Sequence, residues 1–110
     1  MNNDIHYTNN RIYRITLVIK DFRDKETELI AYGRRSRRLP LTIQRAALKK
    51  LRQLDAAATL EDLRIPPGNR LEALAGRRLG QHSIRINAQW RICFYFRDGD
   101  AYSVEIADYH

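Results

Sequence analysis

The chain of 110 residues is poor in the features that mark secreted, zinc-binding or membrane proteins. Its single cysteine excludes an internal disulfide and a zinc site built on cysteine pairs. The longest apolar run, residues 15–19 with one threonine included, is far shorter than the roughly 20 residues that a bilayer requires. The first residues lack the basic start and apolar centre of a secretory signal. These absences predict a cytoplasmic protein with no membrane partner.

Motifs for metal ions and nucleotides are also missing. The sequence has no glycine-rich phosphate loop with a lysine, no His-Glu-x-x-His and no Cys-x-x-Cys. Its three histidines, His6, His82 and His110, are scattered along the chain. We therefore expect no metal site and no cofactor. Cys93 lies between arginines without an obvious neighbouring base, which makes it a poor candidate for a nucleophile.

Positive charge is what the chain has in excess. The net charge is +7, and residues 1–55 carry 13 basic and six acidic side chains, whereas residues 56–110 carry seven of each. Sixteen of the 20 basic residues are arginine, the side chain suited to bidentate phosphate contacts and to stacking on bases. A polyanionic partner would explain this asymmetry, and a coding bias toward arginine would explain the composition equally well.

The apolar pattern predicts one domain that begins with a strand and two helices. Residues 11–21 are rich in β-branched and aromatic side chains, which favours a strand. A first helix is expected from an N-cap at Asp21 to a stop at Gly33. Pro40 opens the second helix, which has a clear apolar stripe: Ile43, Ala47, Leu51, Leu54 and Ala58.

The sequence of the second half of the chain predicts a helical turn followed by strands. Thr59 and Asp62 have the spacing of a capping box. Asp98 and Gly99 form the typical sequence of a tight hairpin turn. The expected strands cover residues 70–74, 82–86, 90–96 and 101–110.

Alternation along the two middle strands predicts their register. A loop of three residues, 87–89, pairs Ile86 with Trp90 and Arg85 with Arg91, and this keeps one face of the sheet wholly apolar. A loop of two residues would place charged and apolar side chains on the same face of the sheet. We therefore expect the helices on the apolar face, with Arg85 and Arg91 side by side on the open one. A bound phosphate would relieve the repulsion between them.

Other basic residues are candidates for contacts with nucleic acid. Four arginines surround Ser36 between the two helices, a run that is either a solvated loop or a phosphate-binding surface. A lysine lies on the polar side of the second helix, and a basic turn precedes the middle strands. The predicted RNA-binding residues are Arg34, Arg35, Arg37, Arg38, Lys49, Arg77, Arg78 and Arg85.

The last three residues, Asp108, Tyr109 and His110, bring together an acid, a phenol and an imidazole. Such a polar end can simply fray. Beside arginines it also suits cleavage of RNA, in which the 2′-hydroxyl attacks the neighbouring phosphodiester. That reaction needs a base, an acid for the leaving 5′-oxygen and cations for the charge on phosphorus. His110 fits either proton-transfer role, and Tyr109 can stack on a base or donate a hydrogen bond.

Three stretches of the chain carry a family resemblance: GNRLEALAG at 68–76, SIRINAQWRICF at 83–94 and DGDAYSVEIADYH at 98–110. They resemble the HigB-type killer toxins of bacterial toxin–antitoxin pairs, within the RelE/ParE superfamily. The resemblance implies an α+β fold for residues 18–110, a RelE-like compact domain with an N-terminal strand, two helices and a small, mainly antiparallel sheet with helices on one face. Residues 1–17 are then an N-terminal extension. The implied activity is that of a ribosome-dependent, metal-independent endoribonuclease that cuts messenger RNA.

The resemblance also implies partners and residue roles. The expected partner is a cognate helix-turn-helix antitoxin, with operator DNA bound only through the antitoxin complex. Asp108, Tyr109 and His110 fall on the family's functional ending, and Arg91 falls on an arginine of its phosphate-binding group. The family often has a histidine where this chain has Glu72, and a lysine three positions later. We expect a slower or milder toxin unless Glu72 takes over proton transfer and Arg77 or Arg78 supplies the missing positive charge.

Two other functions fit the same residues. A ParE-like inhibitor would bind DNA gyrase and cleave nothing, and a basic RNA- or ribosome-binding module would use its arginines only for positioning. Neither requires an imidazole at the last residue, so substitution of His110 separates both from the nuclease.

Overall fold

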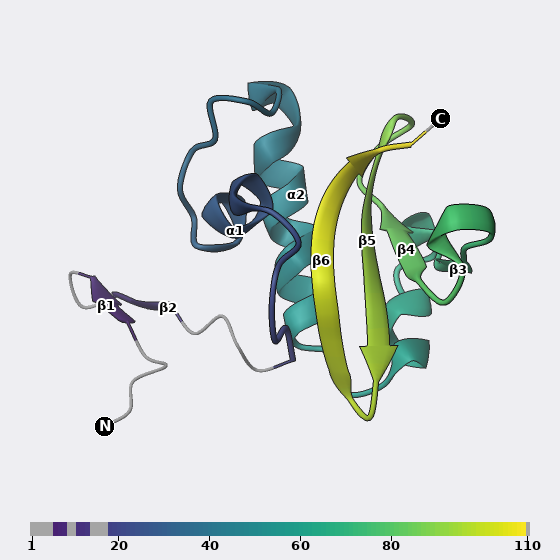
Figure 1. Cartoon of the computed structure of the whole chain (residues 1–110). Helices are drawn as coiled ribbons and strands as arrows, with labels where there is room; N and C mark the ends of the chain where they lie inside the picture. The colour runs from purple at the N-terminus through teal and green to yellow at the C-terminus, as the bar shows by residue number, and fades with distance from the viewer. Residues whose placement is uncertain (1–5, 9–10, 14–17, 110) are drawn as a thin grey trace.

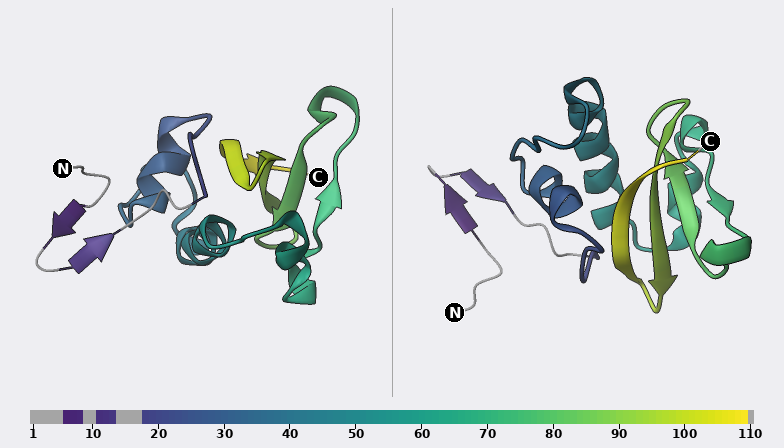
Figure 2. Two further views of the ribbon diagram at one scale, coloured as in Figure 1. Left: turned by 90° about the horizontal axis from the view of Figure 1, so that it is seen from below. Right: turned by 45° about the horizontal axis from the view of Figure 1, so that its top comes forward.

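Two helices pack against a four-stranded antiparallel sheet in the computed structural model, which describes residues 6–8, 11–13 and 18–109 (Figure 1). Helix α2 lies against β5 and β6, and helix α1 lies beside β6 (Figure 2). This arrangement confirms the predicted α+β architecture. In chain order, the two helices and the strands of this sheet are α1 (Lys25–Ala31), α2 (Leu41–Asp55), β3 (Glu72–Ala73), β4 (His82–Arg85), β5 (Trp90–Arg97) and β6 (Asp100–Asp108).

Helix α1 begins later than predicted. Asp24, and not Asp21, is the N-cap, because its carboxylate accepts a hydrogen bond from the backbone N–H of Thr27 at 2.7 Å. The carboxylate of Asp21 instead accepts from the backbone N–H of Ser103 on β6 at 2.5 Å. The helix ends before Gly33, whose φ of 79° lies in the left-handed region, as the sequence predicts.

Helix α2 starts directly after Pro40, as predicted. The apolar stripe is confirmed as far as Leu54, since its members are buried against the sheet. Ala58 was expected to continue the stripe, but it lies beyond the end of the helix and is exposed. The neighbouring Ala57 is buried in its place, because the chain leaves the helical path after Asp55.

The hairpin of β4 and β5 has the predicted register. The backbone N–H of Ile86 donates to the carbonyl of Trp90 at 2.8 Å, and Arg85 lies opposite Arg91. On the other face of the same strands, Ile84 and its neighbours join the main core with the stripe of α2. The helices therefore cover the apolar face, as expected.

Strand β6 contains a bulge that the sequence did not reveal. The strand follows the predicted tight turn at Asp98 and Gly99, whose φ values are 49° and 82°. Ser103 then adopts a φ of 52°, and the register with β5 shifts at this point. Beyond the bulge, Glu105 and Ala107 lie on the sheet face opposite the helices, because they pair with residues of that face on β5.

The segment by which the chain enters the domain is held in place by hydrogen bonds. The backbone N–H groups of Val18 and Ile19 donate to the buried carboxylate of Asp55 at 3.0 and 2.9 Å. Ile19 also forms a parallel bridge with Ala101 on β6. This segment therefore pairs with part of the edge strand, which would otherwise expose its backbone groups.

The prediction of one strand over residues 11–21 is wrong. β2 (Arg11–Tyr13) pairs with β1 (His6–Thr8) in a separate two-stranded sheet, whereas the described segment from residue 18 onward bonds to β6 of the main sheet, with the backbone N–H of Ala101 donating to the Val18 carbonyl at 2.9 Å. Residues 14–17 lie outside the described residues. The boundary of the proposed extension, residues 1–17, remains a prediction.

Two short 3₁₀ segments, η1 (Leu60–Arg64) and η2 (Pro67–Asn69), connect α2 with β3, and a third, η3 (Gly76–Arg78), lies between β3 and β4. Thr59 and Asp62 form the predicted capping box at the start of η1. β3 is shorter than the predicted strand at 70–74, because Arg70 adopts a left-handed φ of 46° that interrupts extended backbone. Within the described part of the chain, none of the helices combines the length and apolarity needed to cross a bilayer.

Candidate functional site

A row of four residues crosses the sheet on the face opposite the helices, which we call the outer face. The strand register places them side by side, one from each strand: Glu72, Ser83, Cys93 and Glu105. Neighbouring strands lie about 4.8 Å apart, so the row spans about 14 Å. Its two ends are acidic, and its two central side chains are buried.

Arg91 is held by the protein at one end of this row. Its Nε donates to the hydroxyl of Ser83 at 2.6 Å, and its Nη2 donates to the carbonyl of Arg70 at 2.7 Å. Nη2 also lies 3.4 Å from the Glu72 carboxylate, and the two side chains are 10% and 52% exposed. The pairing of Arg85 with Arg91 is as predicted, but the expectation that Arg91 is open to solvent is wrong. Glu72 neutralises its charge without a bound phosphate.

Arg78 forms a second ion pair at the other end of the row. Its Nη1 lies 3.0 Å from the carboxylate of Glu105 and 3.1 Å from the side-chain oxygen of Gln81. The hydrogen bond to Glu105 is the main cause of a raised pKa for Arg78. Arg23 approaches the same carboxylate at 3.8 Å. The guanidinium of Arg78 is therefore charged and oriented by groups from two different elements.

The thiol of Cys93 lies between these two ion pairs. Burial is the main cause of its raised pKa, the guanidinium of Arg78 lowers it, and the carboxylate of Glu105 raises it further. The side chain is fully buried, so it stays protonated and out of reach of a substrate. This agrees with the expectation that Cys93 is a poor nucleophile. It belongs to a small apolar cluster: Leu74, Cys93 and Ala107.

Asp108 and Tyr109 lie on opposite faces of the sheet. The backbone N–H of Tyr109 donates to the carbonyl of Gln89 at 2.8 Å, which anchors the end of β6. Asp108 pairs with Trp90, so it points to the helix side of the sheet, where Gln89 donates to its carboxylate at 3.1 Å. By alternation Tyr109, which is 38% exposed, belongs to the outer face. His110 lies outside the described residues.

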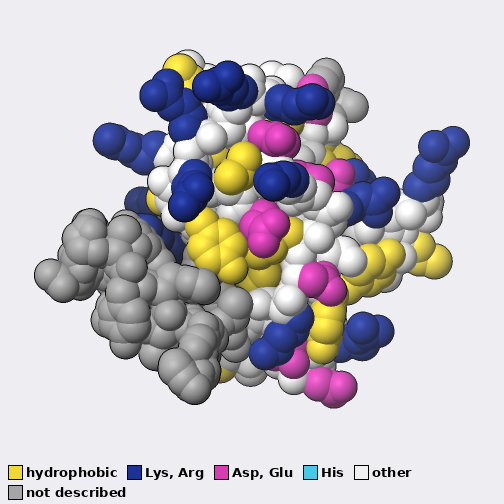
Figure 3. All heavy atoms as spheres, turned by 60° about the vertical axis from the view of Figure 1, so that its left-hand side comes forward, with side chains coloured by type: hydrophobic (Ala, Val, Ile, Leu, Met, Phe, Trp, Pro, Cys, Tyr) yellow, Lys and Arg dark blue, Asp and Glu magenta, His cyan; other side chains and the backbone are white. Residues whose placement is uncertain are grey.

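The predicted RNA-binding residues fall on two separate surfaces. One group lies on the loop between α1 and α2 and on the exposed side of α2. In Figure 1 this region lies on the opposite side of the molecule from β3 and β4. Lys and Arg side chains gather over the upper part of the face that contains α1 (Figure 3). The helical group is Arg34, Arg35, Arg37, Arg38 and Lys49, and the group on β4 and η3 is Arg77, Arg78 and Arg85.

The sequence pattern did not indicate three groups that build the site: Ser83, Glu105 and the Arg70 carbonyl. Ser83 was detectable, because the predicted register places it beside Cys93. Glu105 was concealed by the bulge at Ser103, which changes the alternation along β6. Among the described residues, no three His, Cys, Asp or Glu side chains are grouped so that they could hold a metal ion.

Two helices on one face of an antiparallel sheet form the fold of a RelE-like toxin domain. The model of the family described as the RelE-like toxin of type II toxin-antitoxin system HigB matches residues 20–110. The chain is 46% identical to Toxin HigB-1 of Vibrio cholerae over 82 residues, which cover 74% of this chain and 86% of that protein. It is 33% identical to Endoribonuclease HigB of Proteus vulgaris over 97 residues, which cover 84% and 100%. The chain belongs to the HigB-like toxin family, and an antitoxin is therefore its partner.

Proposed function

We propose that this chain is an endoribonuclease that cleaves messenger RNA on the ribosome, in the cytoplasm, and so stops translation and growth. The observation that carries the proposal is the pair of ion pairs on the outer face, Arg91 with Glu72 and Arg78 with Glu105. The arginines provide positive charge for a phosphodiester, and Glu72 is accessible to solvent. The Proteus vulgaris relative is named an endoribonuclease, which supports the same chemistry.

In the proposed reaction, Glu72 removes the proton of the 2′-hydroxyl, and the oxygen attacks the adjacent phosphorus. The bond to the 5′-oxygen breaks, and this oxygen takes a proton from the imidazolium of His110. The products are a 2′,3′-cyclic phosphate and a 5′-hydroxyl end. Arg91, beside Glu72, stabilises the negative charge that builds up on the attacked phosphate, and Arg78, at the other end of the row, binds a neighbouring phosphate of the RNA. Tyr109 presents an exposed ring on which a base can stack.

Three further predicted residues have supporting roles in this proposal. Arg77 is exposed on η3 and Arg85 lies beside Arg91 on β4, so both extend the positive charge along the path of the RNA. Asp108 acts as a positioning residue, because its contact with Gln89 holds the end of the chain against the β4–β5 loop. We also propose that the antitoxin has a helix-turn-helix domain and that operator DNA is bound only through the complex of toxin and antitoxin.

The base role of Glu72 has a direct test. Purified ribosomes carrying a defined message would be incubated with the wild type and with Glu72→Gln and Glu72→His variants. Loss of the general base should slow cleavage by a factor on the order of 10²–10⁴ in Glu72→Gln. Glu72→His, which installs the residue common in the family, should cleave at least as fast as the wild type. Equal cleavage by Glu72→Gln would remove Glu72 from the reaction.

The gyrase-binding alternative is separated from the nuclease by the last residue. His110→Gln should abolish cleavage and growth inhibition while ribosome binding is retained, because only the leaving group loses its acid. Growth inhibition that persists in this variant, together with inhibited DNA supercoiling, would favour the ParE-like function instead.

A further inference from the structure

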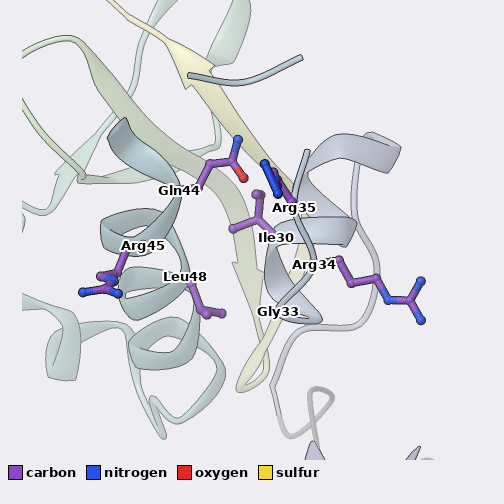
Figure 4. Close-up of a pocket in the computed structure, with 7 residues that line it drawn as sticks. All are labelled: Ile30, Gly33, Arg34, Arg35, Gln44, Arg45 and Leu48. Carbon is purple, nitrogen blue, oxygen red and sulfur yellow. The ribbon is translucent and has the colours of Figure 1, made fainter. Parts of the chain in front are cut away.

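Two shallow hollows lie next to each other along the exposed side of α2. One, of about 260 Å³, opens between the end of α1 and the first half of α2 (Figure 4). The other, of about 480 Å³, continues along the second half of α2 as far as Ala56. Arg45 and Leu48 line both hollows, so the two form one trough, which we call the α2 trough.

The α2 trough has an apolar floor and a basic rim. Ile30 and Leu48 point toward the space between the helices, while Arg34 and Arg45 extend outward on either side of them (Figure 4). None of the residues that line the trough is acidic. The basic residues that line it are Arg34, Arg35, Arg45, Lys49 and Arg52.

The loop that carries part of this rim is held in place. The buried hydroxyl of Ser36 donates to the carboxylate of Glu26 at 2.5 Å and accepts from the backbone N–H groups of Arg38 and Leu39 at 3.1 Å. The side chain of Gln44 on α2 donates to the Ser36 carbonyl at 2.9 Å. The arginines are therefore presented on an ordered loop, which lowers the entropic cost of binding a ligand there.

We infer that the α2 trough binds an acidic protein segment that places an apolar side chain over Ile30 and Leu48. Carboxylates on either side of that side chain would pair with the arginines of the rim. The trough runs from Gln44 to Ala56, which at 1.5 Å per helical residue is about 18 Å, the length of a three-turn helix. Recognition of this kind matches an amphipathic helix in a groove. The inference is independent of the nuclease proposal, because the trough and the outer face are built from different residues.

RNA is the less suitable occupant of the trough. A phosphate backbone would use the arginines but would gain nothing from an apolar floor. For Arg34, Arg35 and Lys49, the inference therefore replaces the RNA contact predicted from the sequence. The chain's own residues 1–17 have the wrong charge for the site, because they carry two arginines and one aspartate.

Binding can be measured by nuclear magnetic resonance titration of the full chain with three probes of about twelve units. The probes are a helical peptide of glutamate and leucine, a peptide of glutamate alone and a single-stranded oligouridylate. The mixed peptide should shift the methyl signals of Ile30 and Leu48 and bind at least about tenfold more tightly than the glutamate peptide. Equal binding of the two peptides, signal changes centred elsewhere, or tighter binding of the RNA at these methyl groups would each overturn the inference.

Variants separate local contacts from overall charge. Arg45→Glu is expected to weaken binding of the mixed peptide by about tenfold or more, and Leu48→Gln should remove its advantage over the glutamate peptide. Lys25→Glu is the matched control, because it makes the same change in charge at the exposed first turn of α1, where an acidic residue is tolerated. It should change the affinity less than twofold. A Lys25→Glu effect as large as that of Arg45→Glu would show that only net charge matters and would contradict the inference.

Discussion

The buried guanidinium of Arg91 donates through its Nε to the hydroxyl of Ser83 at 2.6 Å, across the β4–β5 pair. Ser83 lies beside Cys93 in the row on the outer face, next to Glu72. This contact fixes the plane of the guanidinium and, through it, the position of the Glu72 carboxylate. The orientation of the proposed base thus depends on a buried serine.

The first prediction concerns this serine. Ser83→Ala should lower the free energy of unfolding by about 1–3 kcal/mol, because a buried N–H of a charged group loses its acceptor. Urea unfolding measures the change, and the rate of message cleavage should fall with it. Thr42→Ala, at an exposed position of α2, is the control and should stay within about 0.5 kcal/mol of the wild type. An unchanged unfolding energy for Ser83→Ala would show that the hydrogen bond has no net effect on stability.

A second prediction concerns the orientation of Arg78. Glu105→Gln removes the charged acceptor of Arg78 but keeps the shape of the side chain, so cleavage should slow by about tenfold or more through misplacement of the guanidinium. Because the pair is partly exposed, stability should change by less than about 1 kcal/mol. Arg23→Ala removes only a long, exposed contact to the same carboxylate and serves as the control. Full cleavage activity of Glu105→Gln would exclude the proposed role of this ion pair.

The thiol of Cys93 gives a prediction about pH. Burial raises its pKa in the folded state, so above the unfolded-state pKa of about 8.5 the unfolded chain binds fewer protons at this group than the folded chain does. The free energy of unfolding should therefore decrease as the pH rises from about 7.5 to about 9.5. Cys93→Ala should show a smaller decrease in urea unfolding at the two pH values. The same decrease in both proteins would assign the effect to other groups.

The N-terminal boundary of the domain can be tested by truncation. A variant that retains residues 17–110 keeps the backbone N–H groups of Val18 and Ile19 that bind Asp55, so its Tm should lie within about 4 °C of the full chain. Asp55→Ala should instead lower the free energy of unfolding by about 1.5–3 kcal/mol, because both N–H groups lose a charged acceptor. A truncated chain that fails to fold would show that residues 1–16 belong to the domain.

Local sequence patterns were sufficient to predict much of the sheet and the position of α2. The register that places Arg85 opposite Arg91 follows from alternation alone, because a shift by one residue would expose an apolar face. The start of α1 was harder to predict. Asp21 and Asp24 are both good N-caps, and the choice between them depends on Ser103, which is 82 residues away from Asp21 in the sequence.

The site was predicted less well than the fold, and for similar reasons. Arg91 was assigned to the correct face, but its burial depends on Arg70 and Glu72, whose position is fixed by an irregular segment without a periodic pattern. Asp108 and Tyr109 were predicted to lie together at the chain end, although the alternation of a strand already separates them. Consecutive residues of a strand point to opposite faces, so Asp108 and Tyr109 had to separate.

We propose above all that growth stops because messenger RNA is cut. The most direct measurement is to induce the wild type and the Glu72→Gln variant in cells at equal protein levels and to map the 5′ ends of all messages. We expect new 5′-hydroxyl ends within translated regions for the wild type, and ends that are strongly reduced, together with restored growth, for Glu72→Gln. Growth arrest by the wild type without new ends in messenger RNA would contradict the account.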